Sequence, residues 1–477
     1  MEDFYGLKSY FVITYYVFIS FLIIGIILDN KRPAKSFAYI FLLLLFPIGG
    51  VLLYFLFGVH YQKKKLFTRL RNYHVDYIQI LNDSKNRDKD LIKIIGDNPK
   101  IPTLFYNIDH VQFTDNNEIK YLINGEEKFP ILISELEKAE KTIYLEYYIF
   151  NDDDIGNTII DILCRKSLEG IDVKIIYDPV GSSMSKKSIK KIKKHKIEIH
   201  PYMPVFFSTF AHKANYRNHR KIVVIDDKTG FLGGMNISDK YINPNKINLF
   251  WRDTHLMIKG EAVFDLQLLF ISDWFFVSGK KLEPNKNVDF EVLNNKLPTC
   301  ILGSDYGSEF QYIMEAFFGM ITNAKKEVLI STPYFLPNET ILSALKITAK
   351  SGVKIKLLLP QKTDLISAYY ASQTYLIDLL KNGVEVYYYT KGMMHAKTMI
   401  IDNSICTVGS TNMDHRSFDL NAEVNAFIID EEKSLELKAH FESDLKDAYK
   451  LPINELLNWP WYKKALSSLA RLIAPIL

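Results

Sequence analysis

The sequence contains very few cysteines and no clustered metal ligands. Its three cysteines, Cys164, Cys300 and Cys406, lie far apart among 477 residues, and an odd number cannot all pair within one chain. We therefore expect buried thiols in a fold that does not depend on disulfide bonds. The carboxylate clusters and closely spaced His and Cys pairs that are typical of metal sites are also missing. We predict neither a metal nor a cofactor.

The sequence also lacks a strong excess of either charge. Its formal net charge is +4, so it has no global basic field of the kind found in dedicated nucleic-acid binders. We therefore expect no nucleic-acid partner. Seven lysines gather in the segment 186–196, which is predicted to be helical and either meets anionic lipid headgroups or forms an ordinary solvated helix face.

Long uncharged runs occur only near the N-terminus. Residues 10–28 and 37–58 are almost entirely apolar, and each run is long enough to span a bilayer as a helix. A signal peptide is the alternative for the first run, but the acidic start, the missing cleavage site and the second run disfavour it. We predict a membrane hairpin in residues 1–60.

Basic residues around this hairpin predict its orientation. The connecting loop carries Lys31, Arg32 and Lys35, whereas Lys8, Lys63, Lys64, Lys65, Arg69 and Arg71 flank the two outer ends. The positive-inside rule then places both termini, and the rest of the chain, on the cytoplasmic side of the cell membrane.

A motif of the form H-x-K-x4-D occurs twice, each time with an asparagine downstream. The first copy has His219, Lys221, Asp226 and Asn236, and the second has His395, Lys397, Asp402 and Asn412. The differences 236 − 219 and 412 − 395 are both 17, so the asparagines are in register. One copy can arise by chance in a lysine-rich chain, but two copies in register are a strong signal.

The segments around the motif repeat as well. Predicted strands at 141–150 and 171–177 are retraced by strands at 326–335 and 353–359, with a helical pattern between the members of each pair. We predict an α/β protein with two tandem αβα sandwich domains related by pseudo-twofold symmetry. The predicted boundaries are 61–100 for a basic connector, 101–290 and 291–455 for the two domains, and 456–477 for an amphipathic C-terminal helix that contacts the membrane.

Strand alternation assigns different positions to the motif residues. His219 and Lys221 are two residues apart and share one side of a strand, whereas Asp226 lies at odd parity and precedes a turn signal. The same holds for the second copy. Although Asp226 and Asp402 belong to the catalytic motif, we expect them to have structural roles.

Paired imidazole, lysine and asparagine side chains suit one task, which is to hold a single phosphodiester between two halves. The lysines and asparagines would bind its oxygens and stabilise the charge that develops in the transition state. One imidazole would attack phosphorus to give a phosphohistidine, while the other handles the proton.

An attacking imidazole must be neutral and oriented, so we expect a carboxylate behind each ring. The candidates are Asp253 and Glu423, which lie 34 and 28 residues after the histidines of their own halves.

The paired motif resembles the phospholipase D superfamily. Within it, the segments 215–221, 251–255 and 332–335 and the R-P-A-K-S sequence of the hairpin are similar to bacterial cardiolipin synthases. The resemblance implies two phospholipase D-like domains and transfer of a phosphatidyl group from one phosphatidylglycerol to another, which gives cardiolipin and glycerol. It also implies that His219 is the nucleophile, that His395 is the acid and base, and that membrane lipid is the partner.

Three alternatives remain open at this point. A hydrolytic phospholipase D would use the same residues with water as the acceptor. A nuclease would need a basic groove with stacking aromatic side chains and no membrane spans. A non-catalytic scaffold would not need two complete motifs. The sequence also leaves open whether the chain forms a homo-oligomer, and whether the apolar stretch 203–210, with Phe206 and Phe207, lines a lipid entrance or a core loop.

Overall fold

The computed structural model describes the N-terminal helices and most of the chain from Lys100 onward. The described residues are 2–29, 33–54, 100–109, 111–203, 216–244, 249–285, 288, 290, 296–305, 308 and 311–474. They fall into a small N-terminal unit and a large unit that contains both motif copies.

Three helices make up the described part of the N-terminal unit. α1 (Glu2–Asp29) packs against α2 (Pro33–Leu45), and α3 (Pro47–Leu53) follows a break at Phe46, because Pro47 begins a new helix. Within the described part of the chain, no helix combines the length and the apolarity that a membrane crossing requires.

Several predictions about the N-terminal region and one loop fall on residues that are not described. They are the end of the second apolar run (55–58), the connector up to residue 99, the loop residues Lys31 and Arg32, the basic residues Lys63, Lys64, Lys65, Arg69 and Arg71, and the stretch 204–210 with Phe206 and Phe207. These expectations stay predictions.

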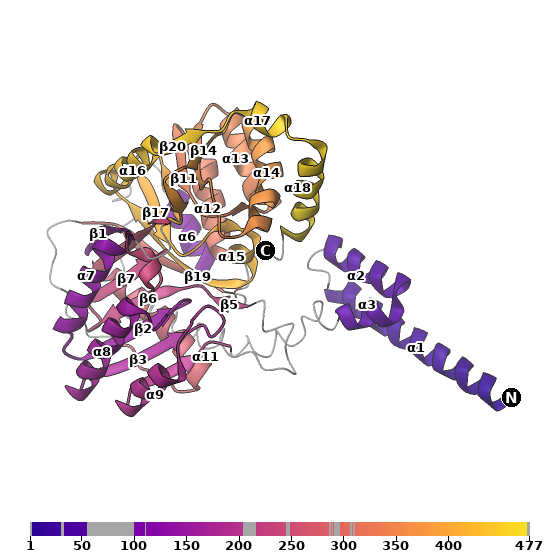
Figure 1. Cartoon of the computed structure of the whole chain (residues 1–477), viewed down its shortest axis with the longest axis horizontal. Helices are drawn as coiled ribbons and strands as arrows, with labels where there is room; N and C mark the ends of the chain where they lie inside the picture. Colours follow the sequence, from indigo (N-terminus) through magenta and orange to yellow (C-terminus); the bar gives the residue numbers. More distant parts are fainter. Residues whose placement is uncertain are drawn as a thin grey trace. The chain divides into compact units, whose positions relative to one another are not determined.

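The first half of the large unit contains a seven-stranded mixed sheet (Figure 1). Its strands are β1 (Asn117–Ile123), β2 (Thr142–Tyr147), β3 (Asp172–Tyr177), β4 (Glu198–Pro201), β6 (Lys221–Ile225), β7 (Thr229–Gly233) and β9 (Thr254–Gly260). They lie in the order β1-β9-β7-β6-β2-β3-β4, in which β2, β3 and β4 are parallel and the other neighbours are antiparallel.

The second half repeats this sheet. Its strands are β10 (Thr299–Ser304), β11 (Glu327–Ser331), β13 (Lys354–Pro360), β14 (Glu385–Tyr389), β16 (Thr398–Ile401), β17 (Ile405–Gly409), β19 (Asn421–Ile429) and β20 (Ala448–Lys450). Their order is β10-β19-β17-β16-β11-β13-β14-β20. The first seven match the first sheet strand for strand, so the predicted repeat is confirmed.

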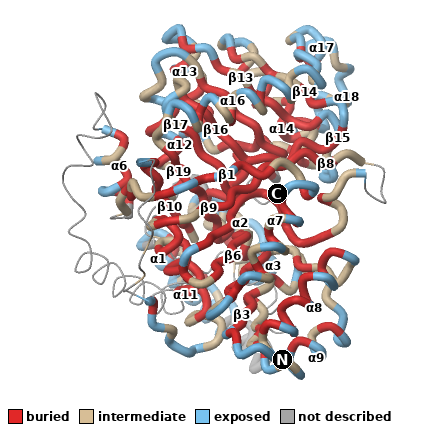
Figure 2. Tube along the Cα trace, turned by 90° about the vertical axis from the view of Figure 1, so that its left-hand side faces the viewer, coloured by how far each residue is buried: buried red, intermediate tan, exposed pale blue. Residues whose placement is uncertain are grey.

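Helices cover both faces of the first sheet. Because side chains alternate along each strand, both faces carry apolar side chains that the helices bury. In β2, Ile143 and Leu145 enter an apolar core that also holds side chains of α7 (Asn124–Lys138) and α8 (Asp154–Leu168). Tyr144 points the opposite way and stacks on Phe270 of α11 (Ala262–Ser278), with ring centroids 4.9 Å apart. Figure 2 shows the strands buried beneath these helices.

The second half has the corresponding helices. They are α12 (Tyr312–Asn323), α13 (Glu339–Lys350), α14 (Ile366–Lys381) and α16 (Glu431–Lys446), and α6 (Lys100–Asp109) packs against α12. The helices predicted in the lysine-rich and C-terminal segments are confirmed as α9 (Lys186–Lys194) and α18 (Trp461–Ile473), the latter after α17 (Ile453–Leu457). Cys164, Cys300 and Cys406 are buried free thiols, as expected.

Two short strand pairs join the halves in a reciprocal manner. β5 (Arg217–Asn218), just before the first motif, pairs in parallel with the start of β19. β15 (Gly392–Met394), just before the second motif, pairs in parallel with β8 (Phe250–Arg252) of the first half. Each motif therefore begins beside a strand of the other half.

The motif aspartates fix the far ends of their strands. Asp226 follows β6, and its carboxylate accepts backbone N–H groups of Glu140, Lys141 and Thr142 at 2.7–2.9 Å. Lys221 begins β6, five positions before Asp226, which is about 16 Å at the usual rise of a strand. Asp226 thus caps the turn after β6 and lies away from Lys221, which is the structural role expected for it.

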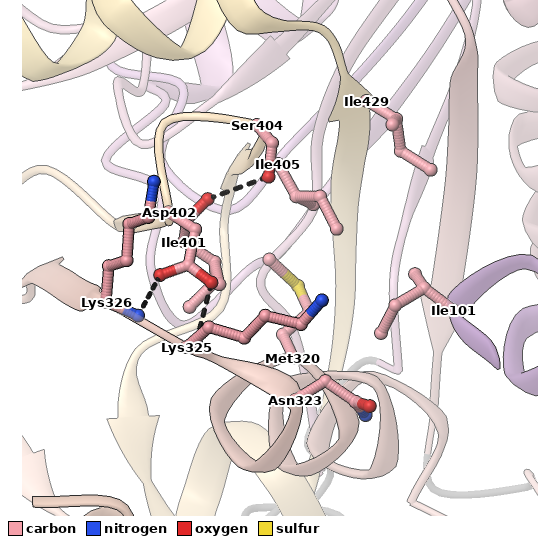
Figure 3. Close-up of a pocket in the computed structure, with 10 residues that line it drawn as sticks. All are labelled: Ile101, Met320, Asn323, Lys325, Lys326, Ile401, Asp402, Ser404, Ile405 and Ile429. Carbon is pink, nitrogen blue, oxygen red and sulfur yellow. Dashed lines mark hydrogen bonds between the residues drawn. The ribbon is translucent and has the colours of Figure 1, made fainter. Parts of the chain in front are cut away.

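Asp402 makes the same contacts in the second half. Its carboxylate accepts the backbone N–H groups of Lys325, Lys326 and Glu327 at 2.7–2.8 Å. Figure 3 shows the contacts with Lys325 and Lys326. Both aspartates have a positive φ of 53°, a conformation that Asp tolerates in tight turns. Asp402 therefore caps the turn after β16, as was also expected.

A pocket of about 250 Å³ lies beside the Asp402 turn (Figure 3). It is lined by Ile101, Met320, Asn323, Lys325, Lys326, Ile401, Asp402, Ser404, Ile405 and Ile429. None of these is a motif histidine, lysine or asparagine, so the pocket is separate from the candidate active site.

Candidate active site

Each motif histidine lies between two strands and is held by the other half of the chain. The backbone N–H of His219, between β5 and β6, donates to the carbonyl of Ala422 at 2.9 Å. The backbone N–H of His395, between β15 and β16, donates to the carbonyl of Arg252 at 2.7 Å. Ala422 and Arg252 are the residues just before Glu423 and Asp253.

This register pairs the carboxylates and imidazoles across the halves. The Nδ1 of His219 lies 3.0 Å from both carboxylate oxygens of Glu423, and the Nδ1 of His395 lies 2.6 Å from Oδ2 of Asp253. The structure thus places both predicted carboxylates behind imidazoles, but the predicted pairing within each half was wrong. The separations of 34 and 28 residues join each histidine to the carboxylate of its own half, whereas the contacts join each histidine to the carboxylate of the other half.

These contacts set the protonation of each ring. Burial lowers the pKa of His219 to about 4, although Glu423 opposes this shift. Burial, together with the charges of Lys397 and Lys240, also lowers the pKa of His395 well below its ordinary value. Both imidazoles are therefore neutral near pH 7 in the free protein. Because a carboxylate can only accept, Nδ1 carries the hydrogen and Nε2 keeps its lone pair.

The two carboxylates are ionised near neutral pH. Burial raises the pKa of Asp253 to about 6, with Lys397 and the backbone N–H of Thr254 opposing the shift. For Glu423, burial is outweighed by the His219 ring, Lys221 and the Ser410 hydroxyl, so its pKa lies below the ordinary value.

The motif lysines lie beside the rings and are completely buried or nearly so. The ammonium groups of Lys221 and Lys397 each donate to the carbonyl of the histidine two residues earlier, at 2.6 Å in both halves. Burial lowers the pKa of Lys221 to about 7 and that of Lys397 to about 8. Both lysines also lower the pKa of each histidine, which shows that the four groups share one electrostatic site.

The two asparagines are buried but not equivalent. The amide of Asn236 accepts from the backbone N–H of Ile149 at 3.0 Å and donates to the hydroxyl of Tyr241 at 2.7 Å. The buried amide oxygen of Asn412 has no hydrogen-bond partner among the described residues. Their predicted phosphate contacts stay predictions.

The second residue of each G-x-x-N segment contacts one of the two carboxylates, and the two contacts differ. Gly234 lies against Asp253, and a Cβ atom there would come within 2.1 Å of Oδ1. At the equivalent position the Ser410 hydroxyl donates to Glu423. Sequence reasoning did not assign these roles, although the difference between G-G-x-N and G-S-x-N was visible.

Arg220 is another residue that the sequence analysis missed. Its buried guanidinium donates to the carbonyl of Glu423 at 3.2 Å, to the carbonyl of Ser304 at 3.3 Å, and to the carboxylate of Asp273. It links the first half to β19, which carries Glu423, and to the neighbouring β10, which carries Ser304. Only its place between His219 and Lys221 could have suggested this role.

Aromatic rings surround both imidazoles. Tyr148 meets His219 edge to face, with centroids 5.1 Å apart. Trp251 and Tyr241 lie 5.3 and 6.0 Å from the ring of His395. Within the described part of the chain, no group of three or more His, Cys, Asp or Glu side chains is placed to hold a metal ion.

Comparisons with known proteins identify the family. The family described as "Cardiolipin synthase, PLD-like domain" matches residues 132–268 and 317–445. The chain is 37% identical over 466 residues to a cardiolipin synthase of Halalkalibacterium halodurans, covering 96% of this chain and 92% of that protein. It is 37% identical over 492 residues to a probable cardiolipin synthase of Bacillus subtilis, covering 100% of this chain and 94% of that protein.

Among solved structures, the fold is similar to that of the phosphatidylserine synthase of Haemophilus influenzae. The TM-score is 0.62 at 16% identity, over 79% of this chain and 100% of that one. At this identity the likeness concerns the fold alone. The family match and the full-length relatives are more specific, and they show that the chain belongs to the cardiolipin synthase family, with two phospholipase D-like domains.

Proposed function

We propose that this protein is a cardiolipin synthase, which transfers a phosphatidyl group from one phosphatidylglycerol to another and releases glycerol. The observation that supports this most is the crossed pairing of imidazoles and carboxylates, His219 with Glu423 and His395 with Asp253. It provides two oriented rings in one site, one to attack phosphorus and one to carry the proton, which is what a double displacement at phosphorus requires.

The reaction proceeds in two displacements. In the first, Nε2 of His219 attacks phosphorus, the bond from phosphorus to the glycerol headgroup oxygen breaks, and protonated His395 gives its proton to that oxygen. In the second, a hydroxyl of another phosphatidylglycerol gives its proton to His395 while its oxygen attacks phosphorus and the bond to His219 breaks. The choice of His219 as the nucleophile follows the family resemblance.

The buried lysines provide the charge for both steps. Lys221 and Lys397 have lowered pKa values because both are buried, and the charge of Lys397 adds to the shift of Lys221. A bound phosphodiester anion would stabilise both ammonium groups and would also favour the imidazolium form of His395 beside Asp253. Asn236 and Asn412 are proposed to add amide contacts to the phosphate.

The proposal also places the enzyme at the membrane. α18 buries its small residues Ser467 and Ala470 but exposes Trp461, Leu469 and Leu472, whose exposed fractions are 79%, 63% and 76%. The charged residues of this helix are all basic, which suits an anionic lipid surface. The predicted spans at 10–28 and 37–58 belong to the same proposal.

Product analysis tests the activity. Purified enzyme in detergent with phosphatidylglycerol is expected to form cardiolipin and free glycerol, and a chelator should leave the rate unchanged. His219→Ala and His395→Ala should each reduce turnover by a factor on the order of 10³ or more. Formation of phosphatidic acid without cardiolipin would show a hydrolase, and degradation of DNA or RNA would show a nuclease.

The pH dependence of kcat/KM tests the protonation states. We expect kcat/KM to rise through pH about 4, where His219 becomes neutral, and to fall through about 6, where the pair of Asp253 and His395 loses the proton that His395 must donate. The fall should become steeper above about 7, where Lys221 loses its proton. In Lys221→Arg this steeper fall should begin only at about 8, the pKa of Lys397, because a guanidinium keeps its charge. A steeper fall that still begins at about 7 in this variant would contradict the role of Lys221.

Lipid contact can be measured on the full chain in phosphatidylglycerol vesicles. Brominated acyl chains should quench tryptophan fluorescence, and Trp461→Phe should remove most of this quenching, because the exposed Trp461 side chain enters the lipid. Equal quenching in the variant would exclude contact through α18. Release of the chain from membranes by alkaline carbonate would contradict the two predicted spans.

A further inference from the structure

A third lysine lies beside His395. Lys240 belongs to the short 3-10 helix η3 (Asp239–Tyr241), four residues after Asn236. Its ammonium lies 4.6 Å from the ring centroid of Trp251 and 5.2 Å from that of Tyr241. The same two rings contact the imidazole of His395, so the ammonium of Lys240 is held on the His395 side of the site.

Lys240 differs from the motif lysines in its exposure and partners. Lys221 and Lys397 are buried and donate to backbone carbonyls, whereas Lys240 is half-buried, so a ligand can reach it. Burial lowers the pKa of Lys240, but the charges of Asp364 and Asp253 act in the opposite direction. The carboxylate of Asp364 is itself held by the hydroxyl of Tyr334 at 2.5 Å.

The proposed reaction requires a cation at such a position. The acceptor phosphatidylglycerol brings its own phosphodiester anion, and in the product a single three-carbon glycerol bridge separates the two phosphates. Lys221 and Lys397 are occupied by the reacting phosphate. When the acceptor hydroxyl reaches His395, the phosphate of the acceptor lipid must therefore lie nearby. An anion that leaves water needs a new partner there.

We propose that Lys240 binds the phosphate of the acceptor lipid and thereby favours a phospholipid over glycerol or water as the acceptor. This inference rests on the proposed function, with His219 as the nucleophile and His395 as the base for the acceptor. Lys240 is then a specificity residue for the second displacement.

The repeat provides a matched control residue. Arg416, in α15 (His415–Asp419), follows Asn412 by four residues, as Lys240 follows Asn236. Its charge acts on Tyr148, whose ring contacts His219. Arg416 therefore lies on the side where the phosphatidyl group is attached, and it is not expected to distinguish between acceptors.

Two reactions of the same full-length enzyme separate these roles. One is cardiolipin formation from phosphatidylglycerol, and the other is incorporation of labelled glycerol into phosphatidylglycerol, in which the acceptor has no phosphate. Lys240→Gln should reduce cardiolipin formation about 10- to 100-fold, the usual effect of losing a charged hydrogen bond, while glycerol incorporation stays within about twofold. Lys240→Arg should restore most of the cardiolipin rate.

The ratio of the two rates is the decisive readout. Any effect of Lys240 on the pKa of His395 or on folding changes both reactions together and leaves their ratio unchanged. Arg416→Gln should lower both rates equally, and Lys350→Gln, an exposed position at the end of α13, should change neither. An equal loss of both reactions in Lys240→Gln, or a selective loss of cardiolipin in Arg416→Gln, would overturn the assignment. A wild-type enzyme that performs neither reaction would refute the proposed function itself.

Discussion

The site depends on two hydrogen bonds that cross between the halves of the chain. His219 is oriented by Glu423 and His395 by Asp253, so neither half contains a complete imidazole and carboxylate pair. The short parallel pairings of β5 with β19 and of β15 with β8 enforce this exchange, because they place each histidine beside the residue that precedes the opposite carboxylate. The site is therefore complete only when both halves of the chain contribute to it.

The crossed contacts also gather two buried ammonium groups in one site, which favours the binding of an anion. Lys221 and Lys397 are buried cations whose pKa values fall to about 7 and about 8, with two carboxylates as their main compensation. Keeping such groups charged away from water is unfavourable without a partner. A phosphodiester bound between them relieves this cost, so the donors are already in place when charge develops in the transition state.

Much of this arrangement could be predicted from the sequence. The repeat, the reacting imidazoles and lysines, the turn role of the aspartates and both carboxylates follow from spacing and strand alternation. The histidine that each carboxylate contacts could not be predicted, because sequence distance favours the histidine of the same half. The crossed contacts arise only from the strand pairing between the two halves. Lys240 and Arg416 were detectable in principle, since both stand four residues after a motif asparagine, but spacing alone assigns them no contact.

The most direct test of the crossed arrangement is nitrogen-15 NMR of the histidine rings in the full-length protein. Glu423→Gln should shift the ring nitrogens of His219 and leave those of His395 unchanged, and Asp253→Asn should have the reverse effect, because each amide replaces the carboxylate that accepts from Nδ1. If Asp253→Asn instead perturbs His219 and Glu423→Gln perturbs His395, each half orients its own histidine and the crossed arrangement is wrong.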